Sequence, residues 1–136
     1  MPRGERTARH RVLIIDDEES TRLLVARYLS KDLKIEAHLA GTCEQALRYA
    51  GDYAYDAILL DLLMPGIGGL EVLKEIRRAS PNASTPVVVI SVVSDQDTID
   101  RALAEGASAY HVKPVRRAEI VATVQQQIAS RRKSAR

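Results

Sequence analysis

The sequence has one cysteine and no long apolar run, and each scarcity limits what the protein can be. Cys43 is the single cysteine among 136 residues, so no disulfide can form within the chain. One unpaired thiol favours a reducing compartment, and we expect the cytoplasm. No apolar run approaches the ~20 residues that a membrane-spanning helix needs. Residues 1–11 are polar and lack the apolar centre of a secretory signal.

The length and composition fit one globular domain. A chain of 15.0 kDa with 46% hydrophobic and 28% charged residues is ordinary for a soluble protein. A chain of this length buries enough surface to fold without a disulfide or a structural metal.

The charge is unevenly distributed along the chain. Residues 1–11 have a net charge of +3 and residues 130–136 one of +4, whereas residues 12–129 hold 12 basic and 17 acidic residues, a net −5. We therefore expect an acidic domain over residues 11–130, with solvated basic tails at 1–10 and 131–136. The domain itself is not expected to bind nucleic acid, and the alternative role for the tails is a loose contact with an acidic partner.

Five short apolar runs alternate with five amphipathic stretches, and there is no internal repeat. Three runs are almost continuous Val, Ile and Leu, which is typical of strands buried on both faces. A strand–helix unit repeated five times predicts an α/β fold, a doubly wound parallel sheet covered by helices on both faces. The predicted strands are Val12–Ile15, Ile35–Leu39, Ala57–Leu60, Val87–Ile90 and Ala109–Val112, and the predicted helices span 18–31, a stretch opening at Thr42, 69–79, 94 or 95 to 105, and 115–129.

The residues that follow these strands carry the candidate chemistry, because ligands of doubly wound sheets bind beyond the carboxyl ends of the strands. Asp16 and Asp17 follow the first run, Asp61 the third, Ser91 the fourth and Lys113 the fifth. The first loop is acidic and has no glycine, so it does not suit a bare phosphate or a flavin. Clustered carboxylates suit a hard cation such as Mg²⁺. The pattern predicts a magnesium site that can accept a phosphoryl group, whose charge the metal and the lysine neutralise.

Each of these pieces has a common structural explanation when it stands alone. An Asp-Asp pair before a helix often caps that helix. The Met-Pro-Gly stretch at 64–66 is typical of a turn, and Lys113 before Pro114 is typical of a surface bend. Their occurrence at successive strand ends is what favours a functional site.

Taken together, the motifs resemble the receiver domains of two-component response regulators, with a single-domain chemotaxis regulator as the nearest kind. The resemblance covers residues 11–130 and implies a flavodoxin-like (βα)5 fold with the five strands in the order 2-1-3-4-5. The matching stretches are residues 12–18 (Val-Leu-Ile-Ile-Asp-Asp-Glu), residues 61–66 (Asp-Leu-Leu-Met-Pro-Gly), Ser91, and residues 106–114 with Gly106, Ala107, Tyr110, Lys113 and Pro114.

The resemblance implies a role for each acidic residue. Asp61 would be the phosphoacceptor, and Asp16, Asp17, Asp61 and the backbone carbonyl of Leu63 would hold Mg²⁺. Asp17 would be the direct ligand, with Asp16 acting partly through water. A carboxylate is a competent nucleophile that forms an acyl phosphate.

The resemblance also implies how phosphorylation is read out. Ser91 would bond one phosphoryl oxygen and Lys113 would pair with another, with a cis bond between Lys113 and Pro114. Tyr110 would be an aromatic switch that turns inward when Ser91 moves. The output face would be formed by the helix after Ser91, the last strand and the last helix.

The implied protein is a response regulator rather than an enzyme: it takes a phosphoryl group from a sensor histidine kinase or a histidine phosphotransfer protein and assists its own phosphorylation and dephosphorylation. The sequence departs from the common pattern at Gly68, Val92 and Ala109, and the last departure weakens the case for a charge-paired dimer. Which kinase and target it meets, whether it relays phosphate or ends the pathway, whether it dimerises weakly, and whether the chain is a fragment stay open.

Three other functions compete with this interpretation. A docking module that never uses phosphate would lack Asp61, Lys113 or the acidic pair, and all are present. A nucleic-acid binder acting through its tails predicts steeply salt-dependent binding. A hydrolase of the aspartyl-phosphate type resembles Asp-x-Asp-x-Thr after the first strand, which differs from residues 16–18.

Overall fold

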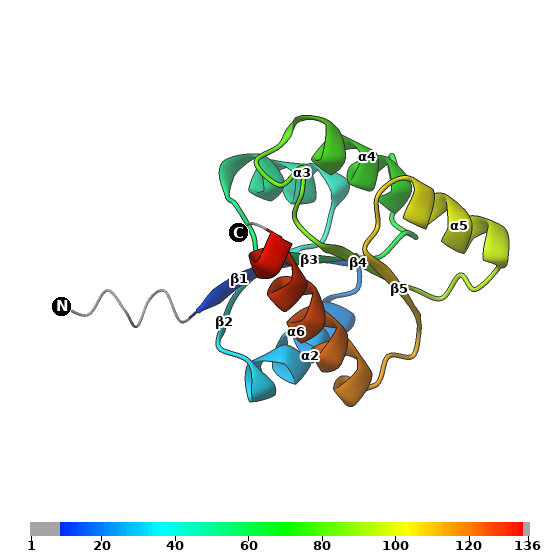
Figure 1. Cartoon of the computed structure of the whole chain (residues 1–136). Helices are drawn as coiled ribbons and strands as arrows, with labels where there is room; N and C mark the ends of the chain where they lie inside the picture. Colours follow the sequence, from blue (N-terminus) through cyan, green and yellow to red (C-terminus); the bar gives the residue numbers. More distant parts are fainter. Residues whose placement is uncertain (1–8, 135–136) are drawn as a thin grey trace.

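Five parallel strands form one sheet in the order β2-β1-β3-β4-β5, as predicted. The computed structural model describes residues 9–134, and Figure 1 shows the central sheet between two layers of helices. The strands are β1 (His10–Ile15), β2 (Ile35–Ala40), β3 (Ala57–Leu60), β4 (Val87–Ser91) and β5 (Ala109–Val112).

Helices cover both faces of this sheet, which explains why its central strands are apolar throughout. One face packs against the first and last helices, and the other face packs against the three between them (Figure 1). The helices are α2 (Glu19–Asp32), α3 (Cys43–Asp52), α4 (Gly69–Ala79), α5 (Gln96–Ala104) and α6 (Arg117–Ser134).

Side-chain caps start two of the helices where the sequence predicts them. The Thr42 hydroxyl accepts a hydrogen bond from the Gln45 amide at 3.1 Å, and α3 begins at the next residue. Asp95 rather than Ser94 caps α5, and its carboxylate accepts from the Thr98 amide at 3.0 Å. Each cap satisfies an amide that the first turn of a helix leaves without a partner.

The first strand and the last helix extend further than predicted. His10 belongs to β1, because its amide donates to the carbonyl of Lys34 at 2.8 Å. The last helix begins at Arg117 and runs to Ser134, past the predicted end at 129. Arg131, assigned by its charge to a tail, donates from Nη1 to the carbonyl of Tyr55 at 2.9 Å, and this contact supports the last turns. Residues 1–8 and 135–136 of the predicted tails lie outside the described residues.

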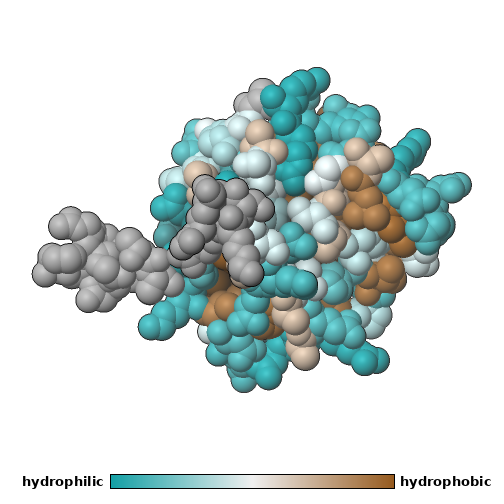
Figure 2. Space-filling model, viewed as in Figure 1, coloured by the Kyte–Doolittle hydropathy of each residue, from teal (hydrophilic) through white to brown (hydrophobic). Residues whose placement is uncertain are grey.

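The described surface is mainly hydrophilic on the face seen in Figure 2, with hydrophobic colour gathered on the side where α5 and β5 lie. Leu103 of α5 and Val112 of β5 are among the exposed large apolar residues. None of the helices in residues 9–134 combines the length and the hydropathy of a membrane-spanning segment.

Candidate functional site

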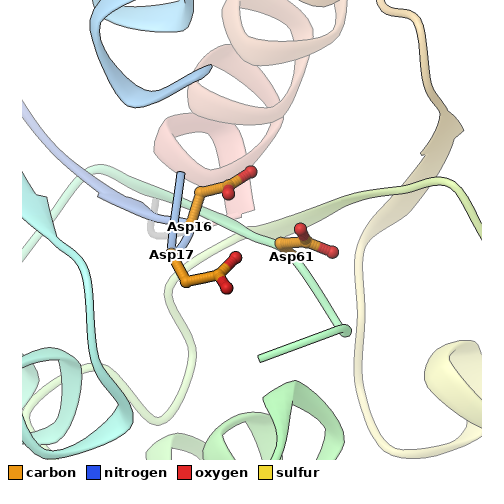
Figure 3. Close-up of side chains that lie close together, drawn as sticks. All are labelled: Asp16, Asp17 and Asp61. Atoms are coloured by element: carbon orange, nitrogen blue, oxygen red, sulfur yellow. The ribbon is translucent and has the colours of Figure 1, made fainter. Parts of the chain in front are cut away.

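Three aspartates meet at the carboxyl edge of the sheet (Figure 3). Ile15 of β1 lies opposite Leu60 of β3, so the residues that follow them, Asp16 and Asp61, leave the sheet side by side. One carboxylate oxygen each from Asp16, Asp17 and Asp61 lies within 4.8 Å of the other two. Asp16 and Asp61 are only 3% and 5% exposed, whereas Asp17 faces solvent. The register of the strands therefore builds the acidic cluster that the sequence predicts.

Lys113, the residue that follows β5, also contacts this cluster. Its Nζ atom lies 2.9 Å from Oδ2 of Asp16 and 3.1 Å from Oδ2 of Asp61. Burial alone would lower the pKa of Lys113, but its hydrogen bonds to the two carboxylates outweigh burial and raise it. The ammonium therefore stays charged between two buried carboxylates. The Lys113–Pro114 bond is cis, as the family resemblance implies.

Asp61 is buried, and its hydrogen bonds only partly compensate its carboxylate for the loss of water. Its Oδ1 accepts a hydrogen bond from the Leu63 amide at 3.0 Å, and its Oδ2 accepts from Lys113. Burial raises the pKa of Asp61, and the Leu63 amide and the Lys113 ammonium oppose that rise without cancelling it. A desolvated carboxylate with few partners is more reactive toward an electrophile than a fully hydrated one.

The start of α4 packs directly against the end of β3 and fixes the loop that carries Asp61. A Cβ atom on Gly69 would lie 2.3 Å from the carbonyl oxygen of Asp61 and 2.5 Å from Cα of Leu62. Only glycine permits this approach, and its amide donates to the Leu62 carbonyl at 3.0 Å. The side chain of Leu63 points outward and is 52% exposed.

Asp16 and Asp17 differ in how much of their bonding capacity the protein uses. Oδ1 of Asp16 accepts from the Glu18 amide at 2.9 Å and Oδ2 accepts from Lys113, so both carboxylate oxygens already have partners. Within residues 9–134 the carboxylate of Asp17 accepts no hydrogen bond. Asp17 is therefore the carboxylate most available to a cation from solvent.

Ser91 and Tyr110 meet at the backbone of Val93. Ser91 is fully buried at the end of β4, and its Oγ accepts from the Val93 amide at 3.2 Å. The Tyr110 hydroxyl donates to the Val93 carbonyl at 2.6 Å. Burial raises the pKa of Tyr110, and the negative charges of Asp95 and Asp61 add to that rise. The two residues predicted to form a switch thus share one backbone contact, in the loop between β4 and α5.

Arg22 also belongs to this region, although its residue type did not single it out in the sequence. Its Nη1 atom donates to the carbonyl of Asp16 at 2.6 Å. Arg22 lies one turn into α2, so its position facing back toward the acidic loop was the available signal.

The comparison with known families agrees with this geometry. The family model of the response regulator receiver domain matches residues 12–125. The chain belongs to the response regulator receiver domain family. It is thus a receiver domain of two-component signalling proteins, in which phosphorylation of an aspartate is expected.

Curated relatives place this receiver domain among larger proteins. The chain is 39% identical over 104 residues to the transcriptional regulatory protein MalR of Bacillus subtilis, a match that covers 76% of this chain and 43% of that protein. The chain spans less than half of the length of the curated relatives it matches.

Solved structures share the fold along almost the whole chain. A CheY-like receiver domain protein from Methanospirillum hungatei aligns with a TM-score of 0.85 over 92% of this chain and 98% of that one, at 20% identity, which bears on the fold alone. The receiver domain of the sensor histidine kinase PA1611 from Pseudomonas aeruginosa aligns with a TM-score of 0.81 at 27% identity, over 90% and 99% of the two chains. That domain was crystallised with a magnesium ion in its active site cleft.

Proposed function

We propose that Asp61 is the phosphoacceptor of this receiver domain and takes its phosphoryl group from a phosphohistidine of a sensor kinase or a phosphotransfer protein. The observation that carries the proposal is the contact set of Asp61. It is a buried carboxylate within 3.1 Å of the Lys113 ammonium and beside two further aspartates. In-line phosphoryl transfer needs mainly such positioning and charge compensation.

The acidic cluster fits a bound Mg²⁺ in its donor chemistry, because three carboxylates offer the hard oxygen ligands that this ion prefers. Asp17, Asp61 and the carbonyl of Leu63 would bind directly, and Asp16 would act through water because both of its oxygens have partners. When bound, the ion would neutralise charge on the phosphoryl oxygens. The magnesium in the PA1611 receiver domain supports this assignment.

The protein's own residues account for the remaining steps. A carboxylate oxygen of Asp61 forms the new bond to phosphorus as the phosphorus–nitrogen bond of the donor breaks, and the histidine nitrogen keeps the electron pair. Lys113 moves from Oδ2 of Asp61 to a phosphoryl oxygen, and the Ser91 hydroxyl donates to another. The product is an acyl phosphate on the protein itself. The domain is therefore a covalent acceptor that assists its own loading and its own hydrolysis.

The readout of phosphorylation follows from the contact between Ser91 and Tyr110. When Ser91 turns to the phosphoryl group it releases the Val93 amide, and the loop that also binds the Tyr110 hydroxyl is free to shift. We expect this to change the face formed by α5, β5 and α6, where Leu103 and Val112 are exposed to a partner protein or a second copy. Such signalling would take place in the cytoplasm.

Intact mass after incubation with acetyl phosphate and Mg²⁺ tests the proposal. One phosphoryl adduct is expected on the wild type, none with a chelator present, and none on Asp61→Asn. The matched control is Asp52→Asn, an exposed aspartate at the end of α3, which should load like the wild type. An Asp61→Asn protein that still gains an acyl phosphate at the wild-type rate overturns the assignment, and a wild type that never loads favours a phosphate-independent docking module.

A further inference from the structure

The structure assigns Arg22 as a positioning residue that sets the acidic loop for a cation, an inference that rests on the proposed magnesium site. Its Nη1 atom donates to the carbonyl oxygen of Asp16 at 2.6 Å, on the loop that carries Asp17. Arg22 touches none of the carboxylate oxygens of the cluster, so its action is on the backbone that carries them.

The contacted carbonyl belongs to the peptide unit that joins Asp16 to Asp17. Because a peptide unit is planar, a hydrogen bond to its oxygen fixes the orientation of the whole unit and the direction in which the Asp17 side chain leaves it. The Asp16 amide is separately bound to the carbonyl of Ala40 at 3.1 Å. Within residues 9–134 no hydrogen bond holds the Asp17 carboxylate itself, so its orientation depends on the two peptide units beside it. Arg22 holds the first at the Asp16 carbonyl, and Oδ1 of Asp16 holds the second at the Glu18 amide.

The end of β2 is shaped to admit the guanidinium. A Cβ atom on Gly41 would lie 2.7 Å from Nη1 of Arg22 and 3.2 Å from its Cζ. Real Cβ atoms do not come so close, so any larger residue at position 41 pushes the guanidinium away. The fold can absorb such a change, because the clashing atoms are the far end of a flexible side chain. The glycine therefore matters for where Arg22 reaches rather than for the path of the backbone.

Positioning and simple electrostatics predict opposite results when Arg22 is removed. A positive charge beside a cation site repels the cation, so charge alone predicts that Arg22→Ala tightens Mg²⁺ binding. Loss of a group that orients a ligand weakens binding, by about 10- to 100-fold for metal sites of known proteins. The sign of the change therefore separates the two roles.

The first experiment is calorimetric titration of the full chain with Mg²⁺ alone. We expect the Kd of Arg22→Ala to rise at least about tenfold, and that of Arg22→Lys to rise also, because an ammonium lacks the reach and fork of a guanidinium. Arg27→Ala removes the same charge from an exposed site on α2 and should leave the Kd close to the wild-type value. Tighter or unchanged binding in Arg22→Ala overturns the inference.

The second experiment keeps every charge and moves only the guanidinium. Gly41→Ala should raise the Mg²⁺ Kd as Arg22→Ala does, and adding it to Arg22→Ala should have no further effect. Gly51→Ala, where a new Cβ meets nothing within 4 Å, is the matched control. Equal melting curves in chelator show that the variants fold, and additive effects of the two substitutions contradict the inference.

Loading at saturating Mg²⁺ separates this inference from the proposed function. Arg22→Ala and Gly41→Ala should both still gain a phosphoryl group on Asp61, but each should need a higher Mg²⁺ concentration for half-maximal loading. A wild type that binds no Mg²⁺ overturns the metal site and with it the role of Arg22. A wild type that binds Mg²⁺ but is never phosphorylated leaves the titrations to decide on Arg22 alone.

Discussion

The two edges of the sheet both bury polar groups, but they treat them in opposite ways. At the amino edge, before β3 and β4, Oδ1 of Asn82 accepts from the Tyr55 amide at 2.7 Å and from the Thr85 hydroxyl at 3.0 Å. Its Nδ2 donates to the carbonyls of Ala50 and Tyr53, both at 2.8 Å. This side chain is fully buried, neutral and fully bonded.

The carboxyl edge instead gathers charge and leaves part of it without compensation. Asp16, Asp61 and Lys113 are largely buried together, and Asp61 has a raised pKa despite its contact with the lysine. A satisfied neutral network rigidifies a fold, whereas a buried ionic cluster contributes little net stability and is available to bind ligands. The contrast indicates that the amino edge of the sheet stabilises the domain, and it supports our proposal that the carboxyl edge performs its chemistry.

The largest effect should come from breaking the amino edge. Asn82→Ala removes the partner of the Tyr55 amide and of the carbonyls of Ala50 and Tyr53. The Thr85 hydroxyl can still donate to the Tyr55 carbonyl at 3.1 Å. We expect a loss of about 3 kcal/mol in the free energy of unfolding. Chemical denaturation measures this, with Ser84→Ala, an exposed residue of the same loop, as the control. The folded fraction of Asn82→Ala should still accept a phosphoryl group on Asp61. A loss below about 1 kcal/mol would contradict the structural role of this edge.

The cluster at the carboxyl edge could be predicted from sequence because each of its groups follows a recognisable strand. The apolar runs fix the five strands, and right-handed crossovers bring their carboxyl ends together. Asp61, Ser91 and Lys113 therefore meet although as many as 52 residues separate them along the chain. No long-range contact had to be known in advance, since the topology supplies it.

The hydrogen-bond network at the amino edge could not be predicted in the same way. Asn82 lies in a Ser-Pro-Asn-Ala-Ser stretch that is typical of a turn, and its four partners are defined only by tertiary contacts. Arg131 likewise looked like part of a charged tail until the Tyr55 carbonyl gave it a partner. Arg22 and its space beside Gly41 depend on the packing of α2 against the end of β2. Residue type alone does not carry this information.

The second prediction concerns the lifetime of the acyl phosphate at the carboxyl edge. Hydrolysis needs a water in line with the bond from Asp61 to phosphorus, and the apolar side chains of Leu63 and Val93 offer such a water no hydrogen bond. Val92, 58% exposed beside them, adds bulk. Positioning lost in this way is worth one or two orders of magnitude in rate, about 1.4–2.8 kcal/mol of barrier. We therefore expect a long-lived phosphoprotein.

Decay of purified phosphoprotein with Mg²⁺ present measures this lifetime. Leu63→Asn, Val93→Glu and the double variant should decay faster than the wild type. Loading must be timed separately, because we also expect the bulk of Val92 to slow the entry of small donors. Equal decay in the wild type and the double variant would show that water held at these two positions does not set the lifetime.

The third prediction is that Asp61→Asn, which removes the proposed phosphoacceptor, raises stability at neutral pH. Since the pKa of Asp61 is higher in the folded than in the unfolded protein, ionising it destabilises the fold. The penalty is absent below the unfolded pKa of about 3.9 and complete above the folded pKa. In chelator, the stability of the variant should therefore rise relative to that of the wild type as pH rises through that interval.

Asp95 provides a control of opposite sign for this pH dependence. Hydrogen bonds from the amide and hydroxyl of Thr98 lower the pKa of Asp95, so its contribution to stability is present above the unfolded pKa and lost as pH falls through the folded one. Asp95→Asn should thus lose stability relative to the wild type at neutral pH and approach it in acid. Parallel pH curves for Asp61→Asn and Asp95→Asn would contradict the difference drawn between the buried cluster and an exposed helix cap.

The smallest effect should come from Ser91→Ala. At the carboxyl edge, this variant separates phosphorylation of the protein from the structural change that follows it. The variant keeps Asp61, Lys113 and the acidic pair, so it should still be phosphorylated. It loses the hydroxyl that accepts from the Val93 amide and that we propose turns to a phosphoryl oxygen. The difference is about one hydrogen bond, or 0.5–1.5 kcal/mol. A two-state loop biased by so little still changes its populations about 2- to 13-fold.

Amide signals of residues 92–106 and 110–120 measure that readout, with and without phosphorylation or a fluoroberyllate mimic. Wild type should shift across both ranges, and Ser91→Ala should lose most of the shift at an equal extent of phosphorylation. Ser94→Ala, an exposed serine three residues on, should retain it. Because the Tyr110 hydroxyl binds the carbonyl of Val93, a full shift in Ser91→Ala would mean that the loop reaches Tyr110 by a route that does not pass through Ser91.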